Sequence, residues 1–241
     1  MVSGELVLTQ DGPIATIVIT NPAKRNAMTA AMWRALPGLL DGPAKDPSVR
    51  VLILAGAGGT FCAGADITEA AAVARAGDAS FAVAAERALA GFPKPTIARI
   101  DGFCVGGGCQ LAVACDLRFA ADDSRFGVTP AKLGIVYPPS TTRRLATLIG
   151  PARAKLLLYT ADLIDAAAAE RMGLVDAVVP AADLADSVLR VATTIAARSG
   201  LTQFAAKRVL ADGDPPDQDE AELAEGLTAF TERRPPHFGW S

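Results

Sequence analysis

Hydrophobic residues in the first half of the chain alternate between short strand-like runs and longer helix-like stretches. Apolar runs rich in β-branched residues predict strands over 5–10, 13–20, 50–56, 94–102 and 116–121. Asp11-Gly12 separates the first two runs, which indicates a hairpin. Helices are predicted over roughly 29–46, interrupted by Pro37, and roughly 67–90. Because strands that alternate with helices form parallel sheets with crossover helices, we expect an α/β fold.

The second half of the chain is mostly helical in pattern. One apolar stripe predicts a helix that ends at Gly200, and its members are Leu184, Val188, Val191 and Ile195. A last helix is predicted to open at Asp217, with Glu220 three residues later as in a capping box. It carries Leu223, Leu227 and Phe230 on one face. The polar segment 211–218 before it is typical of a linker. A one-sided helix after such a break is expected to fold back or to dock on a neighbouring subunit.

Composition and charge restrict the function classes. The chain has 241 residues, 51% of them hydrophobic, and a formal net charge of −3, which argues against a nucleic-acid partner. No apolar run approaches the roughly 20 residues of a membrane span. The N-terminus has no signal-peptide pattern, so we expect a soluble cytoplasmic protein. The four cysteines form no CxxC pair and are expected to be buried thiols in a reducing compartment.

Several common catalytic arrangements do not fit the sequence. The single histidine, His237, lies in the C-terminal tail, which makes a Ser-His-Asp triad improbable. The glycine run at 106–108 is followed by Cys109-Gln110, so it is not a Walker A loop, and Leu111 stands where a dinucleotide fingerprint requires glycine. His and Cys do not cluster, so we expect no metal site.

Two turns rich in glycine and alanine, 56–67 and 102–111, each follow a strand and open a helix. The first N–H groups of a helix have no intrahelical partner and lie at the positive end of the helix dipole. Two such donors that converge on one point would stabilise an oxygen as it gains negative charge. The alternative is that these glycines only permit tight packing between strand and helix.

The two turns and their flanking segments resemble the crotonase family, also called the enoyl-CoA hydratase/isomerase family. The matching segments are "NPAKRNAM" (21–28), "FCAGADI" (61–67), "KPTIARIDGFCVGGGCQLAVACDLRFA" (94–120), "FGVTPAKLGI" (126–135), "AAERMGLVDAVV" (168–179) and "FTERRPPHF" (230–238). The resemblance implies a crotonase-type spiral of β/β/α repeats with a helical C-terminal region, and an enzyme that acts on acyl-coenzyme A thioesters. It further implies a core over 1–195 with the acyl-CoA site, a helical trimerisation or lid region over 196–241, and a homotrimer or homohexamer.

The resemblance also implies site residues. The backbone N–H groups of Ala63 and Gly107 would hold the thioester carbonyl and stabilise its enolate. Coenzyme A would enter as part of the substrate, with no separate cofactor. Its contacts would come from Lys24, Arg25, Ala27, Ala65, Asp66 and Ile67, and from Arg233, which would reach a phosphate, across a subunit boundary in one arrangement. Lys24 and Arg25 are equally compatible with plain surface charges.

Two positions depart from the hydratase pattern. Typical hydratases of this family place one glutamate in the glycine-led helix and a second in the following "FG…LG" segment, and the pair delivers water across the double bond. Gln110 and Pro130 occupy those positions here. Because neither side chain can exchange a proton near neutral pH, hydration by two glutamates is disfavoured.

The segment that contains Thr129, Lys132 and Tyr137 resembles the methylmalonyl-CoA decarboxylase branch of the family. Loss of CO2 from a malonyl-type thioester forms the enolate without a base, and Gln110 and Tyr137 would donate hydrogen bonds to the substrate carboxylate. We therefore predict decarboxylation of a malonyl-type acyl-CoA. Tyr137 could instead be a packed turn aromatic, and Lys132 could point to solvent.

Two other functions stay open. One is a hydratase, isomerase or thioester hydrolase that uses a different acid, Glu69 or Tyr137. The other is an acyl-CoA-binding paralogue without turnover, for which the double loss at 110 and 130 is the sequence support.

Overall fold

The computed structural model describes residues 4–67 and 75–239, which fold as a mixed α/β protein. Its strands are β1 (Glu5–Asp11), β2 (Ile14–Thr20), β3 (Val51–Gly56), β4 (Thr96–Ile100), β5 (Phe103–Val105), β6 (Leu117–Ala121), β7 (Arg125–Gly127), β8 (Ile164–Asp165) and β9 (Ala177–Val179). Its helices are α1 (Ala30–Lys45), α3 (Phe81–Ala90), α4 (Gly107–Ala114), α5 (Pro139–Ile149), α6 (Pro151–Thr160), α7 (Ala166–Arg171), α8 (Leu184–Ala196), α9 (Gly200–Leu210) and α10 (Glu220–Glu232).

The strands form two sheets. The larger has the order β1-β2-β3-β4-β6-β9, and only its β1–β2 hairpin is antiparallel. Every residue of the central strand β3 is buried, as expected for a parallel strand covered on both faces. The smaller sheet has the order β5-β7-β8. The predicted hairpin and parallel sheet are therefore confirmed.

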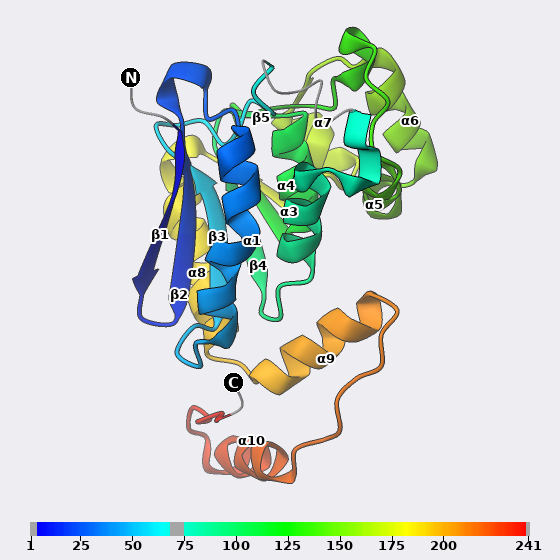
Figure 1. Cartoon of the computed structure of the whole chain (residues 1–241). Coiled ribbons are helices and arrows are strands. Elements are labelled where there is room, and N and C mark those ends of the chain that lie inside the picture. Colours follow the sequence, from blue (N-terminus) through cyan, green and yellow to red (C-terminus); the bar gives the residue numbers. More distant parts are fainter. Residues whose placement is uncertain (1–3, 68–74, 240–241) are drawn as a thin grey trace.

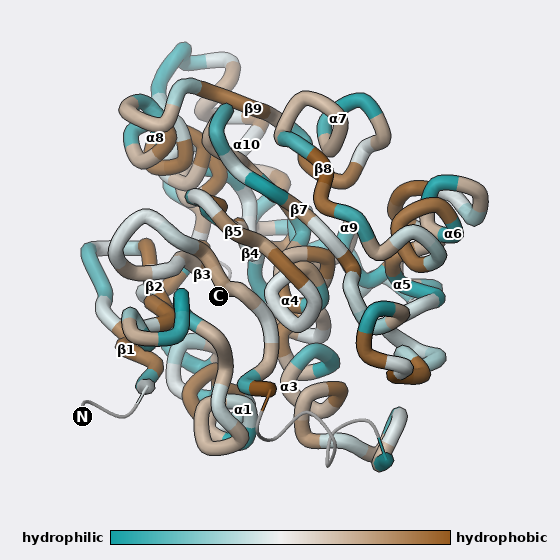
Figure 2. Tube along the Cα trace, turned by 90° about the horizontal axis from the view of Figure 1, so that it is seen from above, coloured by the Kyte–Doolittle hydropathy of each residue, from teal (hydrophilic) through white to brown (hydrophobic). Residues whose placement is uncertain are grey.

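Helices cover both faces of the larger sheet (Figures 1 and 2). On one face α1, α3 and α4 enclose the main core, in which Trp33, Leu54 and Phe61 are fully buried. On the other face α8 packs Leu184 and Val188 against the sheet. The chain thus has one layer of helices on each side of the strands, and the main core lies below the segment that begins α4.

A β/β/α unit repeats along the middle of the chain. Strand β4 adds to the larger sheet, β5 to the smaller one, and α4 follows; β6, β7 and α5 repeat this order. Each repeat therefore passes from one sheet to the other before its helix. The loops between the two sheets consequently meet at one end of the molecule, where β5 and the start of α4 lie (Figure 1).

Several predicted helix boundaries are wrong. In the stretch predicted as one helix over 67–90, α3 begins only at Phe81, after a 3-10 turn over Gly77–Ala79 and the cap Ser80. Pro37 does not interrupt α1, because Trp33, Leu36 and Leu40 bury one continuous stripe against the core. The helix predicted to end at Gly200 ends at Ala196, and Gly200 instead begins α9, whose first turn is capped by the side chain of Ser199.

The last helix starts later than its sequence pattern predicts. Asp219, and not Asp217, caps α10 by accepting hydrogen bonds from the N–H groups of Ala221 and Glu222. The preceding segment forms no regular element, as predicted for a linker.

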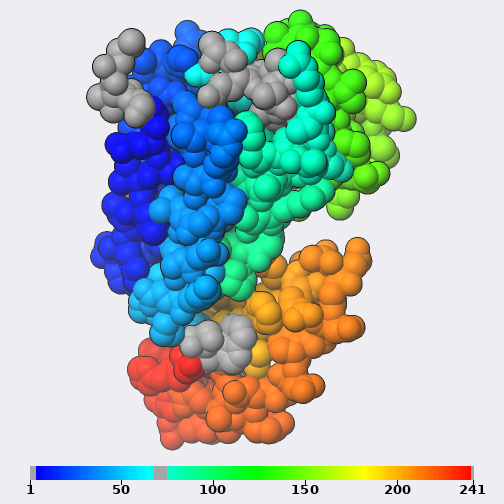
Figure 3. All heavy atoms as spheres, in the orientation of Figure 1, coloured from blue at the N-terminus to red at the C-terminus, as the bar shows by residue number. Residues whose placement is uncertain are grey.

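Helix α10 lies at the opposite end of the molecule from α5 and α6, whereas Leu210 at the end of α9 lines a hollow together with residues of α5 (Figures 1 and 3). Lys207 of α9 holds this region to the body, since its ammonium group donates to the Asp116 carboxylate and the Lys94 carbonyl. On α10 the side chains of Leu227 and Phe230 are 61% and 85% exposed. Within the described residues, no helix combines the length and the apolar character that a bilayer crossing requires.

Candidate active site

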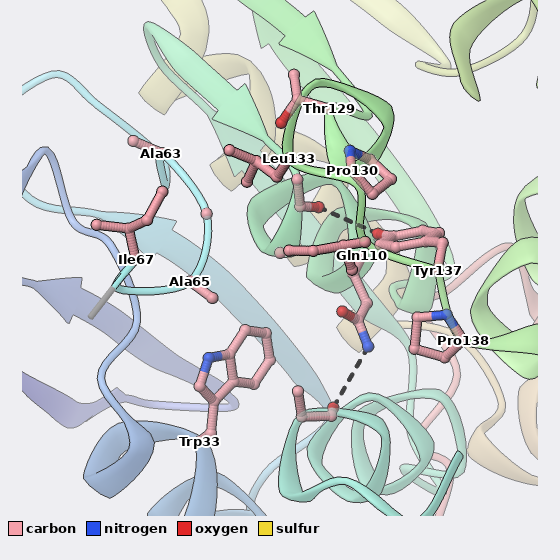
Figure 4. A pocket seen from close by; sticks show the side chains of 15 residues that line it. Trp33, Ala63, Ala65, Ile67, Gln110, Thr129, Pro130, Leu133, Tyr137 and Pro138 are labelled. Atoms are coloured by element: carbon pink, nitrogen blue, oxygen red, sulfur yellow. Dashed lines mark hydrogen bonds between the residues drawn. The ribbon is translucent and has the colours of Figure 1, made fainter. Parts of the chain in front are cut away.

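A cavity of about 220 Å³ opens where the two glycine-rich turns meet (Figure 4). Its walls come from α1, the turn after β3, the start of α4 and the segment before α5. Among the described lining residues none carries a charge; they are Trp33, Ala63, Gly64, Ala65, Ile67, Ala82, Gly106, Gly107, Gln110, Thr129, Pro130, Leu133, Ile135, Tyr137 and Pro138. The cavity therefore suits an uncharged, largely apolar group.

At each of the three consecutive glycines, the structure shows why a residue with a side chain is disfavoured. Gly106 has φ +53° at the position before α4, a conformation that other residues rarely adopt. A Cβ on Gly107 would lie 2.9 Å from Cζ2 of Trp33, and one on Gly108 would lie 2.2 Å from the carbonyl oxygen of Cys62. The absence of these side chains brings the start of α4 against the first turn and the Trp33 ring.

Two backbone N–H groups meet at the cavity wall. Gly107 begins α4, so its N–H has no acceptor within the helix. The nitrogen of Ala65 lies 3.2 Å from where a Cβ of Gly107 would stand, so the two turns are in direct contact. Across the described residues no hydrogen bond uses either N–H group. The two donors can therefore bind one oxygen of a ligand.

The prediction that Ala63 supplies one donor is wrong. The Ala63 N–H donates to the carbonyl oxygen of Arg25 at 3.0 Å and is not available to a ligand. Ala65, predicted only as a coenzyme A contact, is the residue of this turn with a free N–H beside Gly107. The sequence placed the correct turn at the site but did not decide which of its peptide groups pairs internally.

Gln110 lies one helical turn after Gly107 and is 6% exposed. Its amide nitrogen donates to Oε2 of Glu86 at 2.7 Å and lies 3.3 Å from Oγ1 of Thr141. The amide donors are thus directed into the protein, and the predicted donation from Gln110 to a substrate carboxylate is wrong. Figure 4 shows the amide oxygen turned toward the cavity.

Tyr137 forms another part of the wall, together with Thr129 and Pro130. Its hydroxyl donates to the carbonyl oxygen of Gly106 at 3.3 Å (Figure 4). Burial, followed by the nearby Cys109 and Glu86, raises the pKa of the Tyr137 phenol well above its usual value of 10. Tyr137 is therefore a neutral hydroxyl beside the cavity, and Pro130 provides apolar surface where a glutamate would have provided an acid.

The predicted coenzyme A contacts from the first turn gather at the rim. Ile67 lines the cavity and is 67% exposed, while Asp66 is buried and forms an ion pair with Lys24. Arg25 is exposed with its guanidinium 5.2 Å from the centre of the Phe103 ring, and Ala27 is buried next to this segment. The cations of 24 and 25 therefore flank the cavity mouth from the same loop.

Two other predicted residues, Lys132 and Arg233, do not meet the cavity. Lys132 is exposed and pairs with Asp162 at 3.2 Å. Arg233 caps the end of α10, which Figure 1 places away from β5 and α5, so the chain does not bring it to its own cavity. Glu69 lies outside the described residues. Residues 4–67 and 75–239 contain no group of three or more His, Cys, Asp or Glu suited to a metal ion.

Glu86 was not predicted as a site residue from the sequence. This carboxylate is 1% exposed and lies directly behind Gln110, where Arg144 pairs with it at 2.7 Å. One signal was available: Glu86 falls one turn after Ala82 and three residues before Leu89, on the apolar face of an alanine-rich helix. A charge on such a face needs a partner, but the sequence does not identify it; the structure shows Arg144, with Gln110 and Thr141 as further donors.

Comparison with known proteins relates this chain to one family. A family model described as enoyl-CoA hydratase/isomerase matches residues 9–214. The crotonyl-CoA hydratase of Syntrophomonas wolfei is 34% identical, with 97% of each chain covered, and the short-chain-enoyl-CoA hydratase of Clostridium acetobutylicum is 31% identical, with 95% of each covered.

Solved structures that resemble this chain come from the same family. A crystal structure of an enoyl-CoA hydratase/isomerase family member has a TM-score of 0.90 at 36% identity, with 99% of this chain and 97% of that chain covered. The enoyl-CoA hydratase of Bacillus anthracis has a TM-score of 0.89 at 31% identity, with 97% and 98% covered.

Proposed function

Since the chain belongs to the enoyl-CoA hydratase/isomerase family, with the crotonase fold, we propose that it binds an acyl-coenzyme A thioester and stabilises the enolate of that thioester. The observation that carries the proposal is the pair of free N–H groups of Ala65 and Gly107 at the wall of an uncharged cavity. Donors fixed before reaction cost no reorganisation as charge develops on the carbonyl oxygen.

The proposed thioester would lie across the first turn. Its carbonyl oxygen would receive the two N–H groups and its acyl group would enter the cavity. Lys24 and Arg25 would face the phosphates of coenzyme A outside the mouth, since both are exposed cations next to the turn. Coenzyme A would act as part of the substrate, without a separate cofactor.

Decarboxylation of a malonyl-type thioester is the first candidate reaction. None of the described lining residues is an acid, and CO2 loss forms the enolate without a base. The neutral Tyr137 hydroxyl would remain to orient the carboxylate or to protonate the enolate. The Gln110 amide would not assist, because its donors are occupied.

Hydration or isomerisation of an enoyl thioester with a different acid is the second candidate. Two observations favour it: the amide oxygen of Gln110 faces the cavity, which suits a hydroxyl, and the relatives above are named hydratases. Tyr137 is the ionisable group in the described lining, and Glu69 is the alternative acid.

Mass spectrometry of products tests these candidates. The purified protein is incubated separately with crotonyl-, methylmalonyl- and ethylmalonyl-CoA. Loss of CO2 from a malonyl-type ester supports the first candidate, and addition of water to crotonyl-CoA or a shift of its double bond supports the second. Binding without any product would support a non-catalytic acyl-CoA-binding role, and neither binding nor product would overturn the proposal.

A further inference from the structure

A buried polar cluster behind Gln110 determines how this amide is presented to the cavity. Its centre is the Glu86 carboxylate of α3, which accepts hydrogen bonds from three side chains. Arg144 Nε donates at 2.7 Å, Thr141 Oγ1 at 2.5 Å and Gln110 Nε2 at 2.7 Å. A carboxylate that faces a guanidinium and two further donors acts only as an acceptor.

This cluster excludes the flipped orientation of the Gln110 amide. The Thr141 hydroxyl has a single hydrogen, which it donates to Glu86, so it presents only lone pairs to Gln110. The third neighbour of Nε2 is the carbonyl oxygen of Ala82 at 3.5 Å. A flip would place the amide oxygen against three acceptors. The hydrogen-bond network therefore assigns the NH2 group inward and the oxygen toward the cavity.

The amide oxygen needs a donor from whatever occupies the cavity. In the described part of the chain no hydrogen bond uses Gln110 Oε1, and the surrounding wall is mostly apolar. A buried acceptor that loses water without gaining a donor weakens binding. The occupant therefore binds well only if it brings a hydrogen-bond donor to this oxygen.

The helix sets where that donor must be on the ligand. Gly107 and Gln110 are three residues apart on α4, hence on the same side and about 4.5 Å apart along the axis. If the thioester carbonyl binds at Gly107, Gln110 faces atoms attached to the third acyl carbon. A 3-hydroxyl group and a malonyl-type carboxylate would both reach this place, but only the hydroxyl donates a hydrogen bond.

We propose that Glu86, acting through Gln110, sets the acyl specificity of the cavity, which admits a neutral hydrogen-bond donor at the third acyl carbon and rejects a carboxylate there. This inference rests on the proposed binding of acyl-coenzyme A and, of the two candidate reactions, it favours hydration or isomerisation over decarboxylation. A carboxylate at this place would face the Gln110 oxygen, and no cation stands among the described lining residues to compensate, since Arg144 is already paired with Glu86. Glu86 is a positioning residue because it acts only through Gln110.

Equilibrium binding of three coenzyme A esters tests the proposal. The probes are butyryl-CoA, 3-hydroxybutyryl-CoA and methylmalonyl-CoA, each checked by mass spectrometry to be unreacted in the bound state. The wild-type protein should bind the better enantiomer of the hydroxy ester about three- to tenfold more tightly than butyryl-CoA, and methylmalonyl-CoA more weakly than both. Gln110→Leu should remove the preference for the hydroxyl, because butyryl-CoA then no longer leaves a buried oxygen without a donor.

A second variant tests the positioning role. In Glu86→Gln the new amide can present its oxygen to Arg144 and its NH2 to Gln110, which then turns its own NH2 toward the cavity. The affinity ratio should shift from 3-hydroxybutyryl-CoA toward methylmalonyl-CoA, a change that a loss of packing alone would not produce. If this variant does not fold, Gln110→Leu still decides the proposal.

Three results would overturn the inference. Equal affinity of the wild-type protein for butyryl- and 3-hydroxybutyryl-CoA contradicts it, and so does a hydroxyl preference that survives in Gln110→Leu. Both leave the proposed function intact. Failure of all three esters to bind overturns the proposed function itself, and the inference with it.

Discussion

At the scale of single residues, the site is built from groups whose usual partners have been removed. The Gly107 and Ala65 N–H groups have no internal acceptor, whereas the N–H of Ala63, two residues earlier than Ala65, is already paired. Gln110 shows the same principle in a side chain, because one end of its amide is occupied by Glu86 and the other faces the cavity. What each residue can do for a ligand follows from which hydrogen bonds the protein has already formed.

Tyr137 gives a pH-dependent prediction at this scale. Its pKa is raised in the folded protein, so above the ordinary phenol value of about 10 the unfolded chain releases a proton that the folded chain keeps. The free energy of unfolding should therefore fall as pH rises past 10, by up to about 1.4 kcal/mol per pH unit from this residue. Below that pH both states are protonated and the effect vanishes.

Urea unfolding at several pH values between 8 and 11 measures this pH dependence of the free energy of unfolding. Tyr137→Phe should lose less stability on alkalinisation than the wild-type protein, with Tyr159→Phe as the control for removal of an exposed tyrosine. Identical pH slopes for the wild-type protein and Tyr137→Phe would show that burial of this phenol does not affect its ionisation.

At the scale of elements, the closeness of packing decides where glycine is required. A Cβ at Gly38, inside α1, would meet no heavy atom within 4 Å, whereas one at Gly108 would lie 2.2 Å from a backbone oxygen. Both residues lie in helices, so the helical conformation alone does not show which of the two positions requires glycine. The difference lies in what another segment places beside them.

The same substitution should therefore have opposite effects in the two helices. Gly38→Ala should raise the free energy of unfolding by about 0.5–1 kcal/mol, since alanine restricts the unfolded chain and fits the helix. Gly108→Ala should lower it by roughly 1–3 kcal/mol, because the Cys62 carbonyl must move. Denaturant titration measures both; a destabilised Gly38→Ala would contradict the open space beside that residue.

The order of helices and strands could be predicted from the sequence, while the ends of several helices could not. The strands and the hairpin follow from local periodicity, which the chain carries within each segment. The continuity of α1 through Pro37 depends on the stripe it buries, and the break before Gly200 depends on the Ser199 cap. Those are interactions that the apolar pattern does not contain.

Some features of the site could likewise be predicted from the sequence, and others could not. The two turns, Gly107 and the absence of both glutamates were predicted, because they are local features of the sequence. The choice of Ala65 over Ala63, the orientation of Gln110 and the role of Glu86 depend on segments far apart in the chain. A residue's type indicates the hydrogen bonds that it can form, but only the fold shows which of them remain free.

At the scale of the whole molecule, α9 and α10 expose apolar side chains to solvent. The stripe of Leu223, Leu227 and Phe230 predicted from the sequence is exposed on α10. These side chains form an apolar face on α10, and Leu210 of α9 is also 87% exposed. Apolar faces of this kind on a helix favour association between subunits.

We expect this face to be covered in a homotrimer or homohexamer. Leu227→Glu should shift the native mass measured by mass spectrometry from that of the assembly to that of the single chain. Thr194→Glu, at an exposed position of α8, is the matched control and should leave the mass unchanged. A wild-type mass equal to one chain would show that the face has another role.

If Ala65 and Gly107 bind the oxygen of a thioester, the stretching frequency of the thioester carbonyl falls on binding. Isotope-edited infrared spectra would be recorded for butyryl-CoA labelled with ¹³C at the thioester carbonyl, free and bound to three proteins. These are the wild type, Gly107→Ala and Gly107→Pro. Alanine and proline both add a Cβ beside Trp33, but only proline removes the N–H, and proline is tolerated in the first turn of a helix. We expect a lower frequency in the bound wild type and a smaller shift in Gly107→Pro than in Gly107→Ala, because both variants place a Cβ beside Trp33 and the Ala65 nitrogen but only proline removes the N–H. A bound carbonyl whose frequency equals that of the free ester in water, or a shift as large in Gly107→Pro as in Gly107→Ala, would contradict the role of the Gly107 N–H group.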